Sequence, residues 1–286
     1  MRSSNPVFTR SKAFNGTANA YGNQTYAGNG QPHAGYGDPS TWGTGAPGVP
    51  GLVEDSRPMT IDSVVQKSAL TLGVVILTAA VTWWWIGDVT GLLTDSSLAR
   101  LYGATMIGSG LAFVLSMVNS FKRVISPALV VAFAAAEGVA LGGLSKFFDA
   151  RFGDHIVMQA VIGTFAAFAG TLAAYKLFDI KVGDKFRKGV MAAMFGMVGL
   201  ALLEMVLGFF GKQMGFFGFG ALGLLFAVVG LVLGVFMLVL DFDFVENGVA
   251  AGLPERESWR AAFALTVSLV WIYTNLLRIL AILRGD

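Results

Sequence analysis

From Ser68 onward, the chain alternates long apolar segments with short polar connections. Each apolar segment is long enough to cross a hydrocarbon core of about 30 Å as an α-helix. Lipid offers no hydrogen-bond partners to the backbone, so a helix is the conformation that such a segment adopts in a membrane. We therefore predict an all-α membrane protein, a bundle of seven transmembrane helices at residues 68–86, 101–118, 127–145, 156–176, 190–210, 217–242 and 260–282.

The first 58 residues have a different pattern. Gly, Asn, Ser, Thr and Pro dominate there, with isolated aromatic residues and no apolar run. Such a segment cannot bury enough apolar surface to offset the entropy of ordering it, and it lacks the apolar region of a signal peptide. We predict a disordered N-terminal tail over residues 1–58, followed by a membrane domain over residues 59–286. A plain solvated tail and a contact region for a partner both fit its aromatic residues.

Composition agrees with a membrane protein and excludes several classes of function. Hydrophobic residues make up 55% of the chain and charged residues 13%, whereas a soluble domain has roughly 25% charged residues. The chain has no Cys, which excludes disulfides, thiolate nucleophiles and Cys-ligated metals. No block of Lys and Arg interleaved with aromatic residues lies outside the spans, so we expect no nucleic-acid partner. The lipid bilayer is the partner that the composition predicts, and the oligomeric state is left open.

Positive charges divide unequally between the two sets of connections. Short loops on the cytoplasmic side of a membrane protein carry an excess of Lys and Arg. The set that includes the N-terminal flank carries eleven such residues and the opposite set five, so we predict a cytoplasmic N-terminus and an external C-terminus. The basic connection after the fourth span fits this signal alone, with an anionic-lipid site as the alternative. The larger set is Arg57, Lys67, Lys122, Arg123, Lys176, Lys181, Lys185, Arg187, Lys188, Arg256 and Arg260, and the smaller set is Arg100, Lys146, Arg151, Lys212 and Arg284.

The motifs of intramembrane enzymes are incomplete. Gly108-Ser109-Gly110 lacks the preceding glycine of an intramembrane serine protease, and no span has a His in its interior. Val182-Gly183-Asp184 lacks the first glycine of an intramembrane aspartyl protease and falls in a basic connection. Two His and no Cys also give little support to a transition-metal site. We therefore expect no enzymatic activity and no resident cofactor.

Charged side chains inside the spans are few, and each is a functional candidate because an ion is costly to bury in lipid. Glu137 lies in the middle of the third span beside small residues. We expect it to make a structural hydrogen bond to a neighbouring helix in its protonated form, with a role in ion or proton sensing as the alternative. Glu204, in the outer half of the fifth span, is expected to reach headgroup water.

The sixth span carries the strongest candidate, Asp241. It shares one helix face with small residues, so it is expected to face the bundle, where small residues let helices approach closely. Asp243 lies on a different face and nearer the headgroups, so we expect it to snorkel or to cap the helix, and Glu246 follows at the exit. The small residues on the face of Asp241 are Gly223, Gly230, Gly234 and Gly248.

The seventh span has a polar stripe that includes Ser268, Asn275 and Arg278 at helical spacing. Two interpretations stay open for Ser268 and Asn275. They are either interhelical hydrogen-bonding groups worth on the order of 1 kcal/mol each, or part of a polar pathway. Arg278 must find a carboxylate or a carbonyl oxygen as its partner.

Together these motifs resemble the Bax inhibitor-1/YccA family of seven-span membrane proteins over residues 60–284. The tail and Asp241-Phe242-Asp243-Phe244 are most similar to the actinobacterial branch, which implies a bacterial plasma membrane. The motifs that carry the resemblance are Glu137-Gly138 with Leu141-Gly142, Gln159-Ala160 with Gly163-Thr164, Leu240-Asp241 with Val245 and Gly248, and Asn275-Leu276-Leu277-Arg278-Ile279-Leu280.

The resemblance implies a pH-sensitive calcium leak, and in other branches restraint of cell death or of a membrane protease. The family's sensor is a pair of aspartates on the last two helices. Asp241 matches the first, but the second falls on Ser268, and the second span has no Arg to match a basic partner found in some members. Ca²⁺ prefers six to eight oxygen ligands, so a calcium site at Asp241 needs Glu137, Asp243 or backbone oxygens as well.

Two functions therefore stay open. The first is a pH-gated leak for cations, above all Ca²⁺, blocked near Asp241 at the cytoplasmic end. The second is a non-conducting regulatory protein that binds and restrains another membrane protein, such as a protease, through its tail or its helix faces. No internal inverted repeat supports a third class, the proton-coupled transporter.

The predicted topology has a direct test. A reporter fused after Asp286 is expected to behave as extracytoplasmic, because seven spans place the two termini on opposite sides of the membrane. The same reporter fused before the first span serves as the cytoplasmic control. Cytoplasmic activity of the C-terminal fusion would require an even number of spans and would contradict the prediction.

Overall fold

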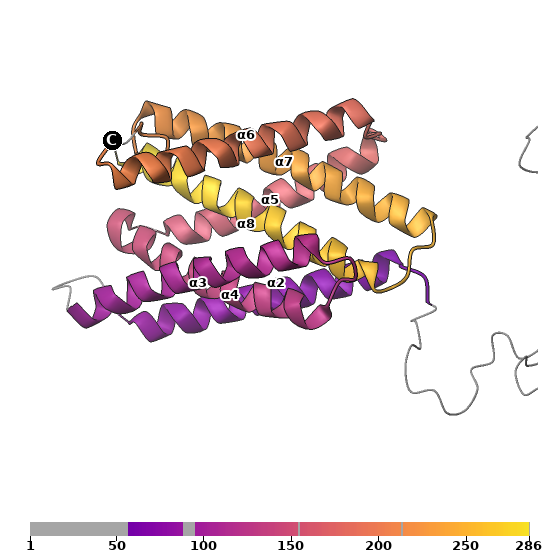
Figure 1. The fold of residues 1–286 in the computed structure, drawn as a ribbon, viewed down its shortest axis with the longest axis horizontal. Coiled ribbons are helices and arrows are strands. Elements are labelled where there is room, and N and C mark those ends of the chain that lie inside the picture. Colours follow the sequence, from indigo (N-terminus) through magenta and orange to yellow (C-terminus); the bar gives the residue numbers. More distant parts are fainter. Residues whose placement is uncertain (1–56, 88–94, 154, 213, 286) are drawn as a thin grey trace, which may run out of the picture. The chain divides into compact units, whose positions relative to one another are not determined.

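The computed structural model describes residues 57–87, 95–153, 155–212 and 214–285. Within these residues lie seven helices, each long and apolar enough to span a membrane, so the predicted seven-helix membrane fold is confirmed (Figure 1). Nearly all of the predicted tail, residues 1–56, lies outside the described part of the chain. The helices are α2 (Ile61–Ile86), α3 (Asp95–Phe121), α4 (Pro127–Phe152), α5 (Ile156–Leu177), α6 (Asp184–Phe209), α7 (Ala221–Ala250) and α8 (Glu257–Arg284).

Several helices extend beyond the apolar segments that predicted them. Helix α2 begins seven residues earlier, at Ile61, because Thr60 and Ser63 form a reciprocal capping box with both bonds at 3.1 Å. Helix α7 continues past residue 242 to Ala250. Apolar content reports the part of a helix that lies in lipid, whereas the helix itself continues into the headgroup region.

Helix α8 lies in the middle of the bundle. It packs against α2, α4, α5 and α7, and Figure 1 shows it running between the layer of α2, α3 and α4 and the pair α6 and α7. Within the described residues α6 packs against α7 alone, and α3 packs against α4 and α2. The last helix therefore joins the two sides of the bundle, together with α5, which packs against both α4 and α7.

We name the two ends of the bundle after the predicted orientation. The inner end is where α2, α4, α6 and α8 begin, and the outer end is the opposite one. At the inner end the segment before α2 pairs with the connection between α7 and α8: Met59 N donates to Leu253 O at 2.6 Å, and Glu255 N donates to Arg57 O at 2.8 Å. Lys67 and Arg57 both contact the Glu255 carboxylate at 3.0 Å. These contacts tie the start of the first span to the start of the last.

Small residues allow α4 to lie close to α2. A Cβ atom added at Gly142 would lie 2.6 Å from the Ala79 carbonyl oxygen and 2.8 Å from Thr82 Cβ, and one at Gly138 would overlap the Thr78 side chain. Lipid provides no hydrophobic force between helices, so such close backbone contact is a main source of attraction between them. The glycine spacing of α4 therefore determines how α2 packs.

Replacing Gly142 by Ala tests this contact. We expect Gly142→Ala to lower stability by about 1–3 kcal/mol, because the obstructing atoms belong to the α2 backbone and cannot move alone. Thermal unfolding in detergent measures the change. The matched control is Gly170→Ala on α5, where a Cβ meets nothing within 4 Å; equal stability of the two variants would contradict the close α2–α4 contact.

Candidate ion- and proton-sensing site

Asp241 lies in the inner third of α7 and faces α8. Its Oδ2 accepts a hydrogen bond from Ser268 Oγ at 2.5 Å, and Ser268 is fully buried. Asp241 therefore faces the bundle, as expected, and is bound to the last helix. The structure thus brings together Asp241 and Ser268, the position at which the resemblance implies a second aspartate.

The expectation that Asp243 snorkels or caps was wrong. Asp243 is buried, with 7% of its surface exposed, and its Oδ2 accepts a hydrogen bond from Arg187 Nη2 at 2.8 Å. The reason is that α7 does not end at residue 242 but continues for two more turns, so Asp243 lies inside the helix on the side that faces α6. Its partner shields it from the apolar surroundings.

Glu246, one turn further along α7, has a third partner. Its Oε2 accepts a hydrogen bond from the Tyr175 hydroxyl of α5 at 2.7 Å. The three side chains Asp241, Asp243 and Glu246, which we call the α7 carboxylates, thus bind α8, α6 and α5 in turn. A single stretch of α7 is joined by its acids to three different helices.

Glu137 does not belong to this group. It is half-buried on α4, and within the described residues it makes no hydrogen bond or ion pair, so the expected interhelical hydrogen bond is not there. Helices α4 and α7 do not pack against each other in the described part of the chain. Glu137 therefore cannot supply a ligand beside Asp241.

Asn275 and Arg278 lie toward the outer end, away from Asp241. Asn275 is seven residues beyond Ser268, about 10 Å along the helix, and donates to its own helix at Trp271 O, 2.8 Å away. Arg278 donates to the carbonyl oxygens of Phe216 and Gly223, which satisfies the expectation of a carbonyl partner. The seventh-span polar stripe is thus divided between two separate places.

Glu204 departs from its expected place. It is buried, with 7% of its surface exposed, and accepts hydrogen bonds from Gly215 N at 2.9 Å and Phe216 N at 3.4 Å. The N–H group of Phe216 thus donates to Glu204, and the carbonyl oxygen of Phe216 accepts from Arg278. The connection between α6 and α7 folds back over Glu204, which no apolar pattern in the sequence indicates.

Two partners of the α7 carboxylates, Arg187 and Tyr175, escaped the sequence analysis. The Lys and Arg residues between the fourth and fifth spans were interpreted as a topology signal, with an anionic-lipid site as the alternative. Gly183 and Asp184, which precede and open α6, are a helix-start signal that places Arg187 in the first turn of that helix. That signal could have shown that Arg187 occupies a fixed position.

The sequence profile of the family described as Bax inhibitor 1 like matches residues 5–285, nearly the whole chain. The chain belongs to this family. No curated protein gives a significant match to the chain.

In this Bax inhibitor 1 like protein, few side chains near Asp241 are available as ligands for a resident Ca²⁺. No group of three or more His, Cys, Asp or Glu side chains suited to a metal occurs within the described residues. Asp241 has the Ser268 hydroxyl beside it, but Asp243 is turned to a guanidinium and Glu137 lies on a helix that does not reach α7. Because Ca²⁺ takes six to eight oxygens, these side chains do not by themselves complete its coordination.

The ion pair at Asp243 gives a testable prediction. We expect Arg187→Gln to destabilise this Bax inhibitor 1 like protein by about 1–3 kcal/mol, since it leaves a buried carboxylate without its charged partner. Thermal unfolding in detergent is the measurement, and Lys188→Gln is the matched control because it removes the same charge from an exposed neighbour.

Adding Asp243→Asn to Arg187→Gln is expected to recover part of the loss, because the buried charge is then absent. If Arg187→Gln unfolds at the same temperature as Lys188→Gln, the contact between α6 and α7 does not depend on this pair.

Proposed function

We propose that this protein is a pH-sensitive leak pathway for cations, above all Ca²⁺, and that proton uptake by the α7 carboxylates opens its inner end. One observation carries the proposal: the three acids of α7 bind three different neighbouring helices at 2.5, 2.8 and 2.7 Å. A change in their charge therefore acts on polar contacts of the inner part of α7 with three helices.

Protonation weakens these contacts for a simple reason. Hydrogen bonds to an ionised group are roughly twice as strong as those between neutral groups. A neutral Asp241 therefore binds Ser268 less strongly than an ionised one. A change of a few kcal/mol is enough to shift a two-state equilibrium between helix arrangements.

The surface that would open is the contact between α7 and α8. At Gly234 an added Cβ would lie 2.7 Å from Ile272, and at Gly230 it would meet Asn275, so bare α7 backbone faces α8. Trp271 of α8 donates to the Gly230 carbonyl oxygen at 2.8 Å. Moving α7 away from α8 would free such carbonyl oxygens, which are suitable ligands for a passing Ca²⁺.

In this proposal Ca²⁺ is the transported ion and not a resident cofactor, and the protein catalyses no reaction. Its place is the plasma membrane of a bacterium, with the N-terminus in the cytoplasm as the positive charges predict. The α7 carboxylates then face the cytoplasmic side, where they respond to cytoplasmic pH.

A specific observation favours the alternative, a non-conducting protein that binds and restrains another membrane protein. Helix α6 packs against α7 alone within the described residues, and it exposes large apolar side chains such as Phe195 and Met205. A helix with so much free surface suits a neighbour within the membrane. The two functions differ in whether the purified protein conducts.

Ca²⁺ flux into liposomes that contain only the purified protein, measured across pH, tests the leak. We expect Asp241→Asn to flatten the pH dependence while leaving the fold intact, because Asn keeps the shape of Asp241 but does not titrate. Glu137→Gln is the matched control, since it removes an acid within the membrane that lies apart from the α7 carboxylates. Absence of flux in the wild type, or unchanged pH dependence in Asp241→Asn, would favour the regulatory alternative.

Ser268→Asp is the opposite experiment. It places a second carboxylate next to Asp241, and two acids in contact titrate as a coupled unit. We expect a pH dependence of Ca²⁺ flux in two steps instead of one. A wild-type profile would mean that the contact between Asp241 and residue 268 does not control the leak.

A further inference from the structure

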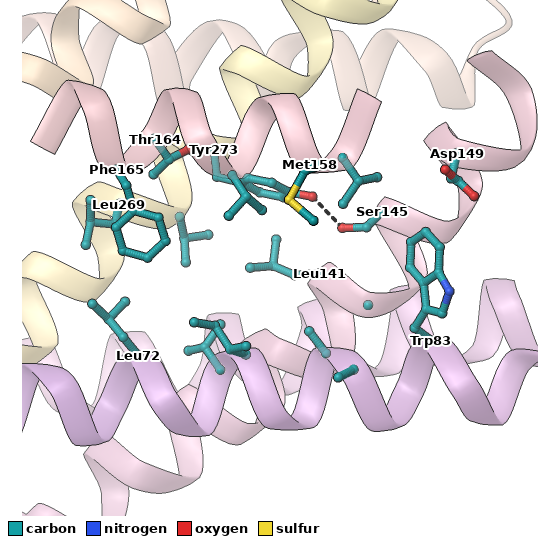
Figure 2. Close-up of a pocket in the computed structure, with 18 of the residues that line it drawn as sticks. Leu72, Trp83, Leu141, Ser145, Asp149, Met158, Thr164, Phe165, Leu269 and Tyr273 are labelled. Atoms are coloured by element: carbon teal, nitrogen blue, oxygen red, sulfur yellow. Dashed lines mark hydrogen bonds between the residues drawn. The ribbon is translucent and has the colours of Figure 1, made fainter. Parts of the chain in front are cut away.

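A second feature of the bundle lies on the far side of α8 from α7. A cavity of about 560 Å³ opens between α2 and α5, with α4 and α8 forming its back wall. Figure 2 shows Leu72 at one end of it and Trp83 and Asp149 at the other. Its volume falls within the range of roughly 300–1,000 Å³ that is typical of pockets for small ligands.

The cavity faces the lipid. Its two side walls, α2 and α5, do not pack against each other in the described part of the chain. Residues on its rim are largely exposed: Ile76 on α2 by 55%, and Met158 and Phe165 on α5 by 59% and 48%. A molecule can therefore enter sideways from the membrane.

The interior is suited to hydrocarbon and not to water. Two polar groups of the back wall, the Ser145 and Tyr273 hydroxyls, are hydrogen-bonded to each other at 2.6 Å, and Thr164 donates to its own helix at Ala160 O. The other polar lining residues, Asp149 and His155, lie at the outer end of the cavity. Most other lining residues are aliphatic or aromatic. Inward of its outer end the cavity therefore has no free polar group. Such a space stays dry in water-soluble proteins, so in a membrane its natural occupant is an acyl chain.

The length of the cavity matches one leaflet. Its lining residues on α2 run from Leu72 to Trp83, about 16 Å along a helix. This is half of a hydrocarbon core of about 30 Å. Trp83 is only three residues from the end of α2 at Ile86, so the cavity covers the leaflet at the outer end.

Asp149 and His155 line the outer mouth of the cavity, and Lys146 lies beside it, against the ring of the lining residue Trp83. Lys146 and Asp149 are three residues apart on α4, which makes them neighbours on the helix surface. Neither forms an ion pair within the described residues, and the Lys146 Nζ lies 4.5 Å from the centre of the Trp83 ring. The headgroup of phosphatidylethanolamine has the matching pair of charges, a phosphate and an ammonium.

We propose that this cavity binds a phosphatidylethanolamine-type phospholipid of the outer leaflet, with one acyl chain between α2 and α5. The phosphate lies at Lys146 and the ammonium at Asp149. Leu269 of α8 contacts the acyl chain. Leu269 directly follows Ser268, so the lipid packs against the helix that is hydrogen-bonded to Asp241.

The test uses the full-length protein in liposomes with a phosphatidylethanolamine that carries a photoactivatable diazirine in one acyl chain. Mass spectrometry is expected to find adducts concentrated on the cavity segments of α2, α5 and α8. Ala80→Trp, which fills the cavity from its exposed rim, should reduce them at least fivefold. Ala166→Trp, on an exposed part of α5 outside the cavity, should leave them unchanged.

Two results would overturn the acyl-chain site: adducts spread evenly over all exposed helix faces of the wild type, or equal labelling of the cavity in both Trp variants. Thermal unfolding in detergent confirms that both variants are folded. Ala80→Leu, a smaller filling of the same position, replaces Ala80→Trp if that variant does not fold.

A second arm tests the headgroup. Labelling is repeated with a phosphatidylglycerol and a diacylglycerol that carry the same diazirine chain. We expect Asp149→Asn to reduce labelling by phosphatidylethanolamine to the level of phosphatidylglycerol. Lys146→Gln should reduce labelling by both phospholipids but not by diacylglycerol. Equal labelling by all three lipids in the wild type would show that the cavity holds any acyl chain and would overturn the assignment of the headgroup.

Discussion

Helix α8 must satisfy its buried polar groups without water, and the rest of the bundle is arranged around that requirement. Its hydroxyl groups find partners on several neighbours: Ser258 with Ser63 and Thr266 with Thr71 on α2, Tyr273 with Ser145 on α4, and Ser268 with Asp241 on α7. An unsatisfied polar group in hydrocarbon costs several kcal/mol. Each bond therefore favours one rotation of α8 relative to one neighbour.

The contacts of α7 differ from those of α8 in one respect that matters for function. Those of α8 are mostly between neutral groups that keep their strength at any ordinary pH, whereas the inner third of α7 is held by carboxylates. Glycines along the same helix allow close approach to α8 but provide no side chains that interlock with it. In the proposed leak, this part of α7 is the element that responds to protons.

The two halves of the molecule along the membrane normal also differ. The inner end is closed by ion pairs and backbone hydrogen bonds that join residues 57–60 to residues 253–255, and by the α7 carboxylates. The outer half leaves a gap between α2 and α5 that protein does not fill. A bundle in lipid tolerates such a gap because lipid can fill it. The cavity between α2 and α5 and the inner end can therefore serve different functions. Helix α8 borders both, through Leu269 and Ser268.

The sequence by itself determined the number of spans, the family resemblance and the direction in which Asp241 faces, because apolar length and helical spacing depend only on local order along the chain. It could not place Asp243, Glu204 or Glu137. The outcome at Asp243 depended on where α7 ends and on Arg187 of another helix, and Glu204 was buried by the fold of the α6–α7 connection. Glu137 was separated from Asp241 because α4 and α7 do not pack against each other. Partners from distant helices are decided by the tertiary arrangement, since helix periodicity specifies a face but not which neighbour covers it.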